Sequence, residues 1–346
     1  MLTKKQVNEI RGKLNSSTNP LFLFDNDPDG LCSFLLLQKY GKKGKGFPIK
    51  SFPELSESYL SKISELNPDC LFILDKPVIS KEFFKKIEEI NLPVVWIDHH
   101  EINRSEIPDF VSYYNPLYNR KKGEEPVTAL CYQVNGDENL QWLAIAGSIS
   151  DKFLPDFYEK FMRKYPDLTI ETKEPYDVFY NSPLGKIARI FSFALKDRTT
   201  NVISMMKFLM KANTPYEVLE DSPLNHSMHY RFEQIDKTYQ KLLNKANKIG
   251  EKSGKLLFFQ YGGELSISSD LSNHLIYQFP NKVVVVIYLN GMKASVSVRG
   301  KNIREKFTKV LEGLTGATGG GHEDAVGGQM NVNDIDSFRV RLEELL

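Results

Sequence analysis

The stretch Val94-Val95-Trp96-Ile97-Asp98-His99-His100 joins a short apolar run to three polar side chains. The apolar run has the length of a buried strand, and Asp98 marks its end. Buried parallel strands of α/β folds present functional groups at their carboxyl ends, and this strand would present a carboxylate and two imidazoles together. The stretch therefore indicates an α/β fold. Its polar end has two interpretations, the edge of a metal site or a polar cluster that caps the strand.

A second strand pattern leads into an acidic turn. The apolar run 21–25 ends at Asp25, and Asp27 and Asp29 follow before an apolar helical stretch at 31–40. Three such carboxylates cannot all stay ionised and close together without a cation, because their mutual repulsion raises their pKa values. They are therefore candidate ligands for a hard metal ion. The alternative is an ordinary solvated turn, since Asp, Asn, Pro and Gly are common turn residues.

Strand and helix patterns alternate along the first half of the chain. An apolar run at 70–74 ends at Asp75, and a helical pattern at 80–90 separates it from the strand that carries Asp98. This alternation predicts a doubly wound parallel sheet with a site along its carboxyl edge. A small-residue helical run ends at Asp151, which is either a plain turn residue or a further carboxylate that reaches the same edge.

These motifs occur together in a known order. The pattern Asp-x-Asp-x-Asp-Gly, the isolated Asp75, the triplet Asp98-His99-His100 and the later Asp151 resemble the DHH phosphoesterase superfamily. That superfamily includes RecJ-type single-strand exonucleases, oligoribonuclease/phosphatase enzymes, cyclic dinucleotide phosphodiesterases and inorganic pyrophosphatases. The resemblance implies a metal-dependent phosphoesterase.

The C-terminal half narrows the resemblance. The run Gly319-Gly320-Gly321-His322 resembles the signature of the DHH-associated substrate domain, and Ser297-Val298-Arg299 resembles the strand before it. Glycines let backbone N–H groups approach a phosphate closely, and an arginine offers a fork that suits phosphate. His322 either donates to a phosphate oxygen or is satisfied within a turn. A second domain of this type argues against a pyrophosphatase.

The resemblance also implies a ligand set for two divalent metal ions, with Mn²⁺ favoured and Mg²⁺ as the alternative. Asp75 would bridge the two ions, and the other ligands would be Asp29, His99 and Asp151 at one ion and Asp25 and Asp27 at the other. Many relatives carry a histidine where Leu23 or Asp25 stands here. This departure leaves the occupancy of the second metal site open.

Two further residues of the motif are expected to take part in catalysis without binding metal. By resemblance, Asp98 and His100 would lie behind the ligands or face the substrate. His100 is the candidate acid or phosphate donor.

The chain is predicted to have three parts. Residues 1–190 would form the catalytic metal-binding DHH domain, and residues 254–346 a smaller α/β DHH-associated domain that binds substrate. Residues 191–253 would be a helical connector, because apolar residues recur at helical spacing over 229–251. His226 and His229 of this connector are expected to have no role in the site.

The composition is that of a globular protein. The chain has 346 residues, 41% hydrophobic and 26% charged, with a net charge of +1 that excludes neither nucleic acid nor small anions as partners.

The N-terminus lacks the apolar core of a signal peptide, and the apolar run 283–289 is too short to cross a bilayer, so we expect a cytoplasmic protein without membrane contact. Cys32, Cys70 and Cys131 are expected to be reduced core residues with no zinc role.

The substrate is the least determined feature. Two basic segments could follow a nucleic-acid backbone or could be ordinary surface: the stretch Lys39, Lys42, Lys43, Lys45 and Lys50, and the run Arg120-Lys121-Lys122. In the first case, base stacking would involve Tyr113, Tyr114 and Tyr118. The chain most resembles archaeal RecJ-like exonucleases, including the Hef-associated type. This implies release of mononucleotides from single-stranded DNA or RNA, with a DNA repair helicase partner and a homo-oligomer. The alternatives are a phosphodiesterase for dinucleotides or nucleoside bisphosphates, and a non-catalytic adaptor.

Overall fold

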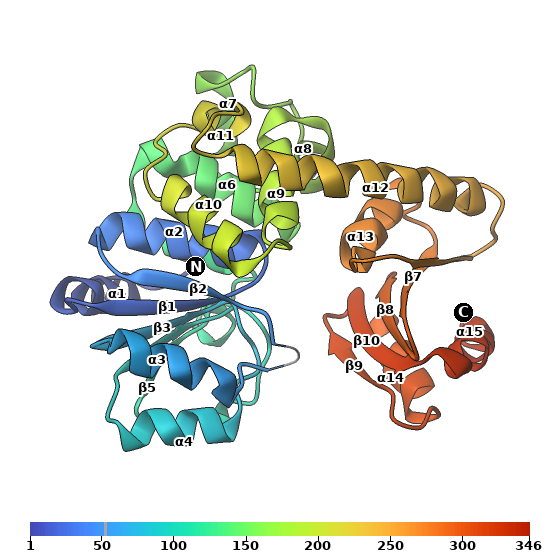
Figure 1. Cartoon of the computed structure of the whole chain (residues 1–346), viewed down its shortest axis with the longest axis horizontal. Helices are drawn as coiled ribbons and strands as arrows, with labels where there is room; N and C mark the ends of the chain where they lie inside the picture. Colours follow the sequence, from blue (N-terminus) through green and yellow to red (C-terminus); the bar gives the residue numbers. More distant parts are fainter. Residues whose placement is uncertain (52–53) are drawn as a thin grey trace. The chain divides into compact units, whose positions relative to one another are not determined.

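The computed structural model describes residues 1–51 and 54–346, which fold into two compact units, Met1–Phe232 and Glu233–Leu346 (Figure 1). The boundary lies inside one long helix, α12 (His226–Gly250), where apolar residues at helical spacing predicted a helix. The helices that precede α12 belong to the first unit, whereas the sequence pattern placed those after residue 190 in the connector.

The first unit is built on a five-stranded sheet in which all neighbouring strands are parallel, in the order β2-β1-β3-β4-β5. The predicted doubly wound parallel sheet is confirmed. Both edge strands were missed, because β2 contains Pro48, which is tolerated only at an edge, and the short β5 contains the polar Ser112 and is only partly buried. The strands are β1 (Pro20–Asp25), β2 (Lys45–Ile49), β3 (Cys70–Leu74), β4 (Val94–Ile97) and β5 (Val111–Tyr114).

Helices cover both faces of this sheet, which explains why its central strands are continuous apolar runs. Leu21 and Leu23 of β1 pack in the cluster formed by α3 (Leu60–Leu66) and α4 (Lys81–Glu89). Phe22 and Phe24 point to the other face, where their rings lie 5.4 and 5.2 Å from that of Phe34 in α2. Figure 1 shows α3 and α4 on one side of the sheet and α2 on the other. The other helices of the unit are α1 (Lys4–Ser16), α2 (Pro28–Gly41), α5 (Val127–Asn135), α6 (Gln141–Ser150), α7 (Tyr158–Lys164), α8 (Pro175–Asn181), α9 (Pro183–Ala194), α10 (Thr199–Leu209) and α11 (Pro215–Leu219).

The strand order places a ligand-binding point between β1 and β3. From β1 the chain goes to β2 on one side, and it then continues with β3 on the other side of β1. Ligands of open α/β sheets bind outside the carboxyl ends of the strands where the order reverses in this way. The acidic turn after Asp25 and the residue Asp75 both lie at this point.

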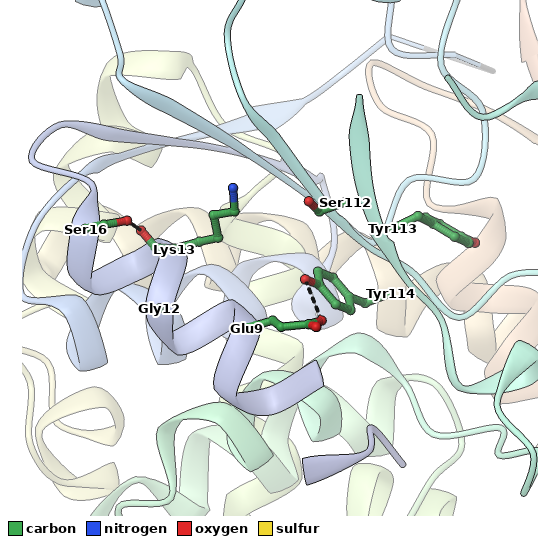
Figure 2. A pocket seen from close by; sticks show the side chains of 7 residues that line it. All are labelled: Glu9, Gly12, Lys13, Ser16, Ser112, Tyr113 and Tyr114. Carbon is green, nitrogen blue, oxygen red and sulfur yellow. Dashed lines mark hydrogen bonds between the residues drawn. The ribbon is translucent and has the colours of Figure 1, made fainter. Parts of the chain in front are cut away.

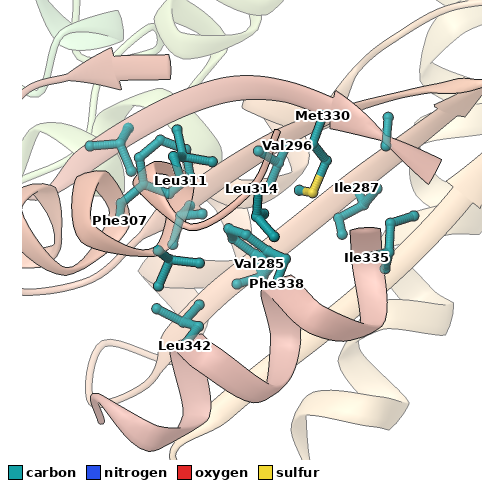
Figure 3. Packing of buried hydrophobic residues seen from close by; sticks show 14 of the residues in the cluster. Val285, Ile287, Val296, Phe307, Leu311, Leu314, Met330, Ile335, Phe338 and Leu342 are labelled. Carbon is teal, nitrogen blue, oxygen red and sulfur yellow. The ribbon is translucent and has the colours of Figure 1, made fainter. Parts of the chain in front are cut away.

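The second unit has its own five-stranded sheet, ordered β6-β7-β8-β10-β9, in which only β6 and β7 are parallel. One core fills the space between the sheet and two helices (Figure 3), where the rings of Phe307 and Phe338 meet at 6.1 Å. The elements of the unit are β6 (Leu256–Gly262), α13 (Ser268–Gln278), β7 (Val283–Asn290), β8 (Lys293–Arg299), α14 (Ile303–Glu312), β9 (Thr318–Gly321), β10 (Ala325–Asn331) and α15 (Ile335–Glu344).

Residues that were expected to have structural roles have them. Cys32, Cys70 and Cys131 are buried and free. His226 lies 3.1 Å from the carboxylate of Asp221, and His229 is hydrogen-bonded to a backbone carbonyl at 2.9 Å. None of the helices that the structure describes is long and apolar enough to cross a membrane.

Gly30 allows the turn from β1 to α2 to close. A Cβ atom at this position would lie 2.3 Å from the carbonyl oxygen of Asp25, whereas a Cβ at Gly12 in α1 would meet no atom within 4 Å. We expect Gly30→Ala to lower the free energy of unfolding by about 2 kcal/mol, because the backbone of Asp25 must shift. Gly12→Ala is the matched control and should raise it by up to about 1 kcal/mol. Urea unfolding measures both, and equal midpoints for the two variants would contradict the steric argument.

Candidate functional site

Two carboxylates of the acidic turn are fixed by helix N-termini. Asp27 caps α2 and accepts a hydrogen bond from the N–H of Gly30 at 2.9 Å. Asp29 is fully buried, and its two oxygens accept from the N–H groups of Val127 at 2.9 Å and Thr128 at 2.7 Å, at the start of α5. A carboxylate has about four lone-pair sites, so both groups keep acceptor capacity for a cation.

Asp75 is held in an unusual backbone conformation at the end of β3. Its φ of 58° lies in the left-handed region, and its N–H donates to the carbonyl of Ile97 at 3.0 Å. The residue is 2% exposed, and its Oδ1 accepts no hydrogen bond from the residues that the structure describes. A buried carboxylate oxygen without a donor is costly unless a cation meets it. This oxygen therefore fits a metal ligand.

The triplet after β4 brings one imidazole to these carboxylates. The Nε2 atom of His99 lies 3.4 Å from Asp75 Oδ1 and 3.4 Å from Asp151 Oδ2. Asp29, His99 and Asp151 each offer a ligand atom within 4.8 Å of the others. Asp151, at the end of α6, thus lies at the same edge as the strand ends, as its metal interpretation requires. Asp29, Asp75, His99 and Asp151 therefore form one group of donors that suits Mn²⁺ or Mg²⁺.

The other two residues of the triplet form a pair. Asp98 is fully buried, and its Oδ1 lies 2.8 Å from Nδ1 of His100. The side chain of Asn115, which the motifs did not indicate, donates to the carbonyl of His100 at 2.8 Å. Asp75, Asp98 and His100 form a second cluster with ligand atoms within 4.8 Å of one another. A carboxylate that holds one imidazole nitrogen fixes the orientation of the ring.

Burial and mutual repulsion disfavour the ionised form of three carboxylates of this edge, Asp27, Asp75 and Asp151. Burial raises the pKa of Asp27 to about 7, with the charges of Asp25 and Asp29 as further causes. Burial, followed by the charge of Asp29, also raises the pKa values of Asp75 and Asp151 well above the ordinary range. A divalent cation removes this penalty, because it favours the ionised form of each group.

The two neighbouring histidines have opposite shifts. Burial lowers the pKa of His99, and the charge of His100 lowers it further. Burial acts in the same direction on His100, but the hydrogen bond with Asp98 and the negative charges of Asp98, Asp25 and Asp29 together outweigh burial and raise the pKa. His99 is therefore suited to bind a metal as a neutral imidazole, and His100 is suited to donate a proton.

Arg299, the predicted phosphate-binding arginine of the second unit, is held by hydrogen bonds to its neighbours. Arg299 Nε donates to Asn273 at 2.6 Å, and one terminal nitrogen donates to Ser269 at 3.0 Å. The other terminal nitrogen donates to two backbone carbonyls, at 2.9 and 3.1 Å. Ser297 lies on the same strand, opposite Gly327 of β10. Phosphate binding by Ser297 and Arg299 stays a prediction.

The glycine run forms a strand. Gly319, Gly320 and Gly321 lie in β9, which pairs with β10 at the edge of the sheet. His322 follows in the turn, where its N–H donates to the carbonyl of Ala325 at 2.9 Å. The edge position keeps the glycine backbone exposed, so the predicted phosphate contact is open to test.

The basic stretch is largely structural. Lys39, Lys43 and Lys50 each donate through Nζ to a backbone carbonyl of another segment of the first unit, at distances of 2.7 to 3.1 Å. Lys42 ends α2 in the left-handed conformation. These contacts favour the surface interpretation of this stretch over a nucleic-acid track.

The candidate stacking tyrosines are held by internal contacts. The ring of Tyr113 packs on Trp96 at 4.7 Å, Tyr114 is 6% exposed with its hydroxyl 3.3 Å from Glu9, and Tyr118 donates to a backbone carbonyl at 2.6 Å. A pocket of about 620 Å³ lies between α1 and β5 (Figure 2). It is lined by Glu9, Gly12, Lys13, Ser16, Ser112, Tyr113 and Tyr114, so it contains no candidate metal ligand.

Comparisons with known proteins agree with this architecture. The family model of the DHHA1 domain matches residues 251–346. No curated protein matches the sequence at a significant level.

Solved structures resemble the chain over both units. RecJ of Thermus thermophilus in complex with Mn²⁺ has a TM-score of 0.69 at 14% identity, and the match covers 100% of this chain but 55% of that one. A manganese-bound exonuclease RecJ has a TM-score of 0.65 at 14% identity, with 100% and 94% covered. The pGpG-specific phosphodiesterase of Vibrio cholerae has a TM-score of 0.51 at 13% identity, with 94% and 97% covered. At these identities the likeness establishes the shared fold.

The raised pKa values predict how stability depends on pH. Since Asp27, Asp75 and Asp151 have folded pKa values above their unfolded ones, the folded chain binds more protons than the unfolded chain, and stability falls as pH rises. In EDTA we expect Tm to decrease from about pH 5 to about pH 8, because the pKa of Asp27 is about 7. Mn²⁺ should raise Tm most at the upper end, where the ligands are deprotonated. Calorimetry with and without Mn²⁺ measures both effects. A metal-free Tm that rises over this range would contradict the assignment.

Proposed function

We propose that this chain is a DHH phosphoesterase that hydrolyses phosphodiester bonds at the acidic edge of its first unit. The observation that carries the proposal is the meeting of Asp29, Asp75, His99 and Asp151, with a buried oxygen of Asp75 that accepts no hydrogen bond from the described residues. The DHHA1 match over residues 251–346 supports a substrate-binding role for the second unit.

The chemistry follows from the roles of these side chains. A divalent ion bound there supplies an acidified water and a positive charge that stabilises the transition state of attack at phosphorus. Asp29, Asp75 and Asp151 supply the negative charge that holds the ion, and His99 adds a neutral nitrogen. His100, held by Asp98 at 2.8 Å, donates to a phosphate oxygen or to the leaving group. The oxygen-rich donor set favours Mn²⁺, with Mg²⁺ as the second choice.

Single-stranded DNA or RNA is the proposed substrate, cut from one end into mononucleotides. The likeness to two RecJ structures, one of them described as an exonuclease bound to manganese, supports this choice. The same proposal includes a DNA repair helicase as partner, a homo-oligomer and a cytoplasmic location. It also places the chain in the archaeal or Hef-associated RecJ-like group.

The second candidate is a phosphodiesterase for dinucleotides or nucleoside bisphosphates. The likeness to a pGpG-specific phosphodiesterase over 94% of the chain favours it. A non-catalytic adaptor is the weakest alternative, because a scaffold does not require a buried carboxylate oxygen without a hydrogen-bond donor.

Digestion of an end-labelled single strand of about 20 nucleotides, beside the dinucleotide pGpG, tests both candidates. We expect Mn²⁺-dependent shortening of the strand, and a loss of about 100-fold or more in kcat for Asp75→Asn, because a metal ligand is removed. Asp156→Asn, the same change at an exposed aspartate, is the control and should retain full activity.

Each outcome of that experiment decides between the candidates. Cleavage of pGpG alone would select the small-substrate enzyme. A chain that cuts neither substrate with Mn²⁺ or Mg²⁺ would overturn the phosphoesterase proposal.

The role of β9 has its own test. A Cβ at Gly320 would meet no protein atom within 4 Å, so Gly320→Ala should leave stability unchanged while it keeps a phosphate from the backbone. We expect KM to rise about tenfold with little change in kcat, since one contact of about 1.4 kcal/mol is lost. Gly263→Ala, another open and exposed glycine of the second unit, is the control. Identical KM values for the two variants would exclude phosphate binding at Gly320.

A further inference from the structure

Lys76 is a buried lysine at the edge of the candidate metal site. It follows Asp75 and is 4% exposed. Its Nζ lies 3.1 Å from Asp25 Oδ1 and 3.3 Å from the carbonyl oxygen of Ser51. Its own carbonyl accepts a hydrogen bond from the indole N–H of Trp96 at 3.0 Å, which fixes the backbone from which the side chain extends. Lysine is almost never buried to this extent without a paired charge.

The ammonium group of Lys76 forms its ion pair with Asp25. The side chain of Asp25 is 33% exposed, and among the described residues Lys76 is the one lysine or arginine in an ion pair with it. Within the residues that the structure describes, no lysine or arginine forms an ion pair with Asp27, Asp29, Asp75 or Asp151. The charge of Asp25 is therefore matched by the protein itself, whereas the other carboxylates of the edge need an added cation.

The donor clusters of the first unit agree with this division. One cluster is formed by Asp29, His99 and Asp151. The other is formed by Asp75, Asp98 and His100, but Asp98 and His100 already bind each other at 2.8 Å, and Asp75 also lies 3.4 Å from His99 of the first cluster. Within the described residues, neither Asp25 nor Asp27 joins a group of three donors. The carboxylate of Asp27 is also engaged as the cap of α2.

We propose that the Lys76 ammonium group takes the place of the second divalent ion, so that each chain binds one divalent ion, at Asp29, Asp75, His99 and Asp151. A further divalent ion at Asp25 would face a fixed charge of the same sign in a buried setting, where repulsion is weakly screened. Lys76 supplies the positive charge there without exchange with solvent. The inference rests on the proposed function in that it assumes a metal site in the first unit.

Metal stoichiometry tests this proposal without reference to activity. Equilibrium dialysis against Mn²⁺, followed by elemental analysis, should give one ion per chain for the wild type. Electron paramagnetic resonance should show the hyperfine pattern of an isolated ion. Lys76→Met keeps the length and flexibility of the side chain and removes its charge, so it should bind two ions and show the spectrum of an exchange-coupled pair. Lys121→Met, at an exposed lysine, is the control and should bind one.

A second variant covers the case in which Lys76→Met does not fold. Asp25→Asn keeps the shape of the side chain, and it should still bind one ion with the affinity of the wild type, because Asp25 pairs with Lys76 and not with metal. Two ions in the wild type, or one ion in a folded Lys76→Met chain, would overturn the role of Lys76. A wild type that binds no Mn²⁺ would instead remove the metal site, and with it the proposed function.

Discussion

Repulsion among buried carboxylates is the constraint on which the first unit depends. Asp27, Asp29, Asp75 and Asp151 are gathered at the strand ends, and burial raises the pKa values of three of them. Such a group is unfavourable in an isolated chain. It is a reasonable arrangement only if a cation is part of the working molecule, and the strand order provides the place for it, where β1 and β3 diverge.

The rest of the unit positions these groups. The helix starts of α2 and α5 direct N–H donors at Asp27 and Asp29, so the acidic turn is stabilised by backbone dipoles before any ion is considered. The two adjacent imidazoles differ in their surroundings: burial lowers the pKa of His99, whereas the contact with Asp98 helps to raise that of His100. Lys76 balances the negative charge of Asp25 through an ion pair, whereas the other carboxylates of the edge have no such partner among the described residues.

Much of this was predictable from the sequence, because buried strands are apolar on both faces and end abruptly in polar residues. The strands that end at Asp25, Asp75 and Asp98 were predicted for that reason, and the structure gathers Asp29, Asp75, His99 and Asp151 at one edge. The edge strands β2 and β5 and the glycine strand β9 were missed, since Pro48 in β2, the polar Ser112 in the partly buried β5 and the three glycines of β9 each hide the pattern of a strand. The contact between Lys76 and Asp25 joins residues 51 positions apart, and spacing alone does not reveal such a pair.

The hydrogen bond from Trp96 to the carbonyl of Lys76 has a thermodynamic consequence. It ties the segment after β3 to the strand that leads into Asp98, His99 and His100, so this bond restrains the two motifs relative to each other. With Asp29 also held by two backbone donors, the donor group is organised before an ion arrives. Capture of an ion at this group would then cost little conformational entropy, and its heat would chiefly reflect the stripping of water from the ion and the loss of protons from the carboxylates.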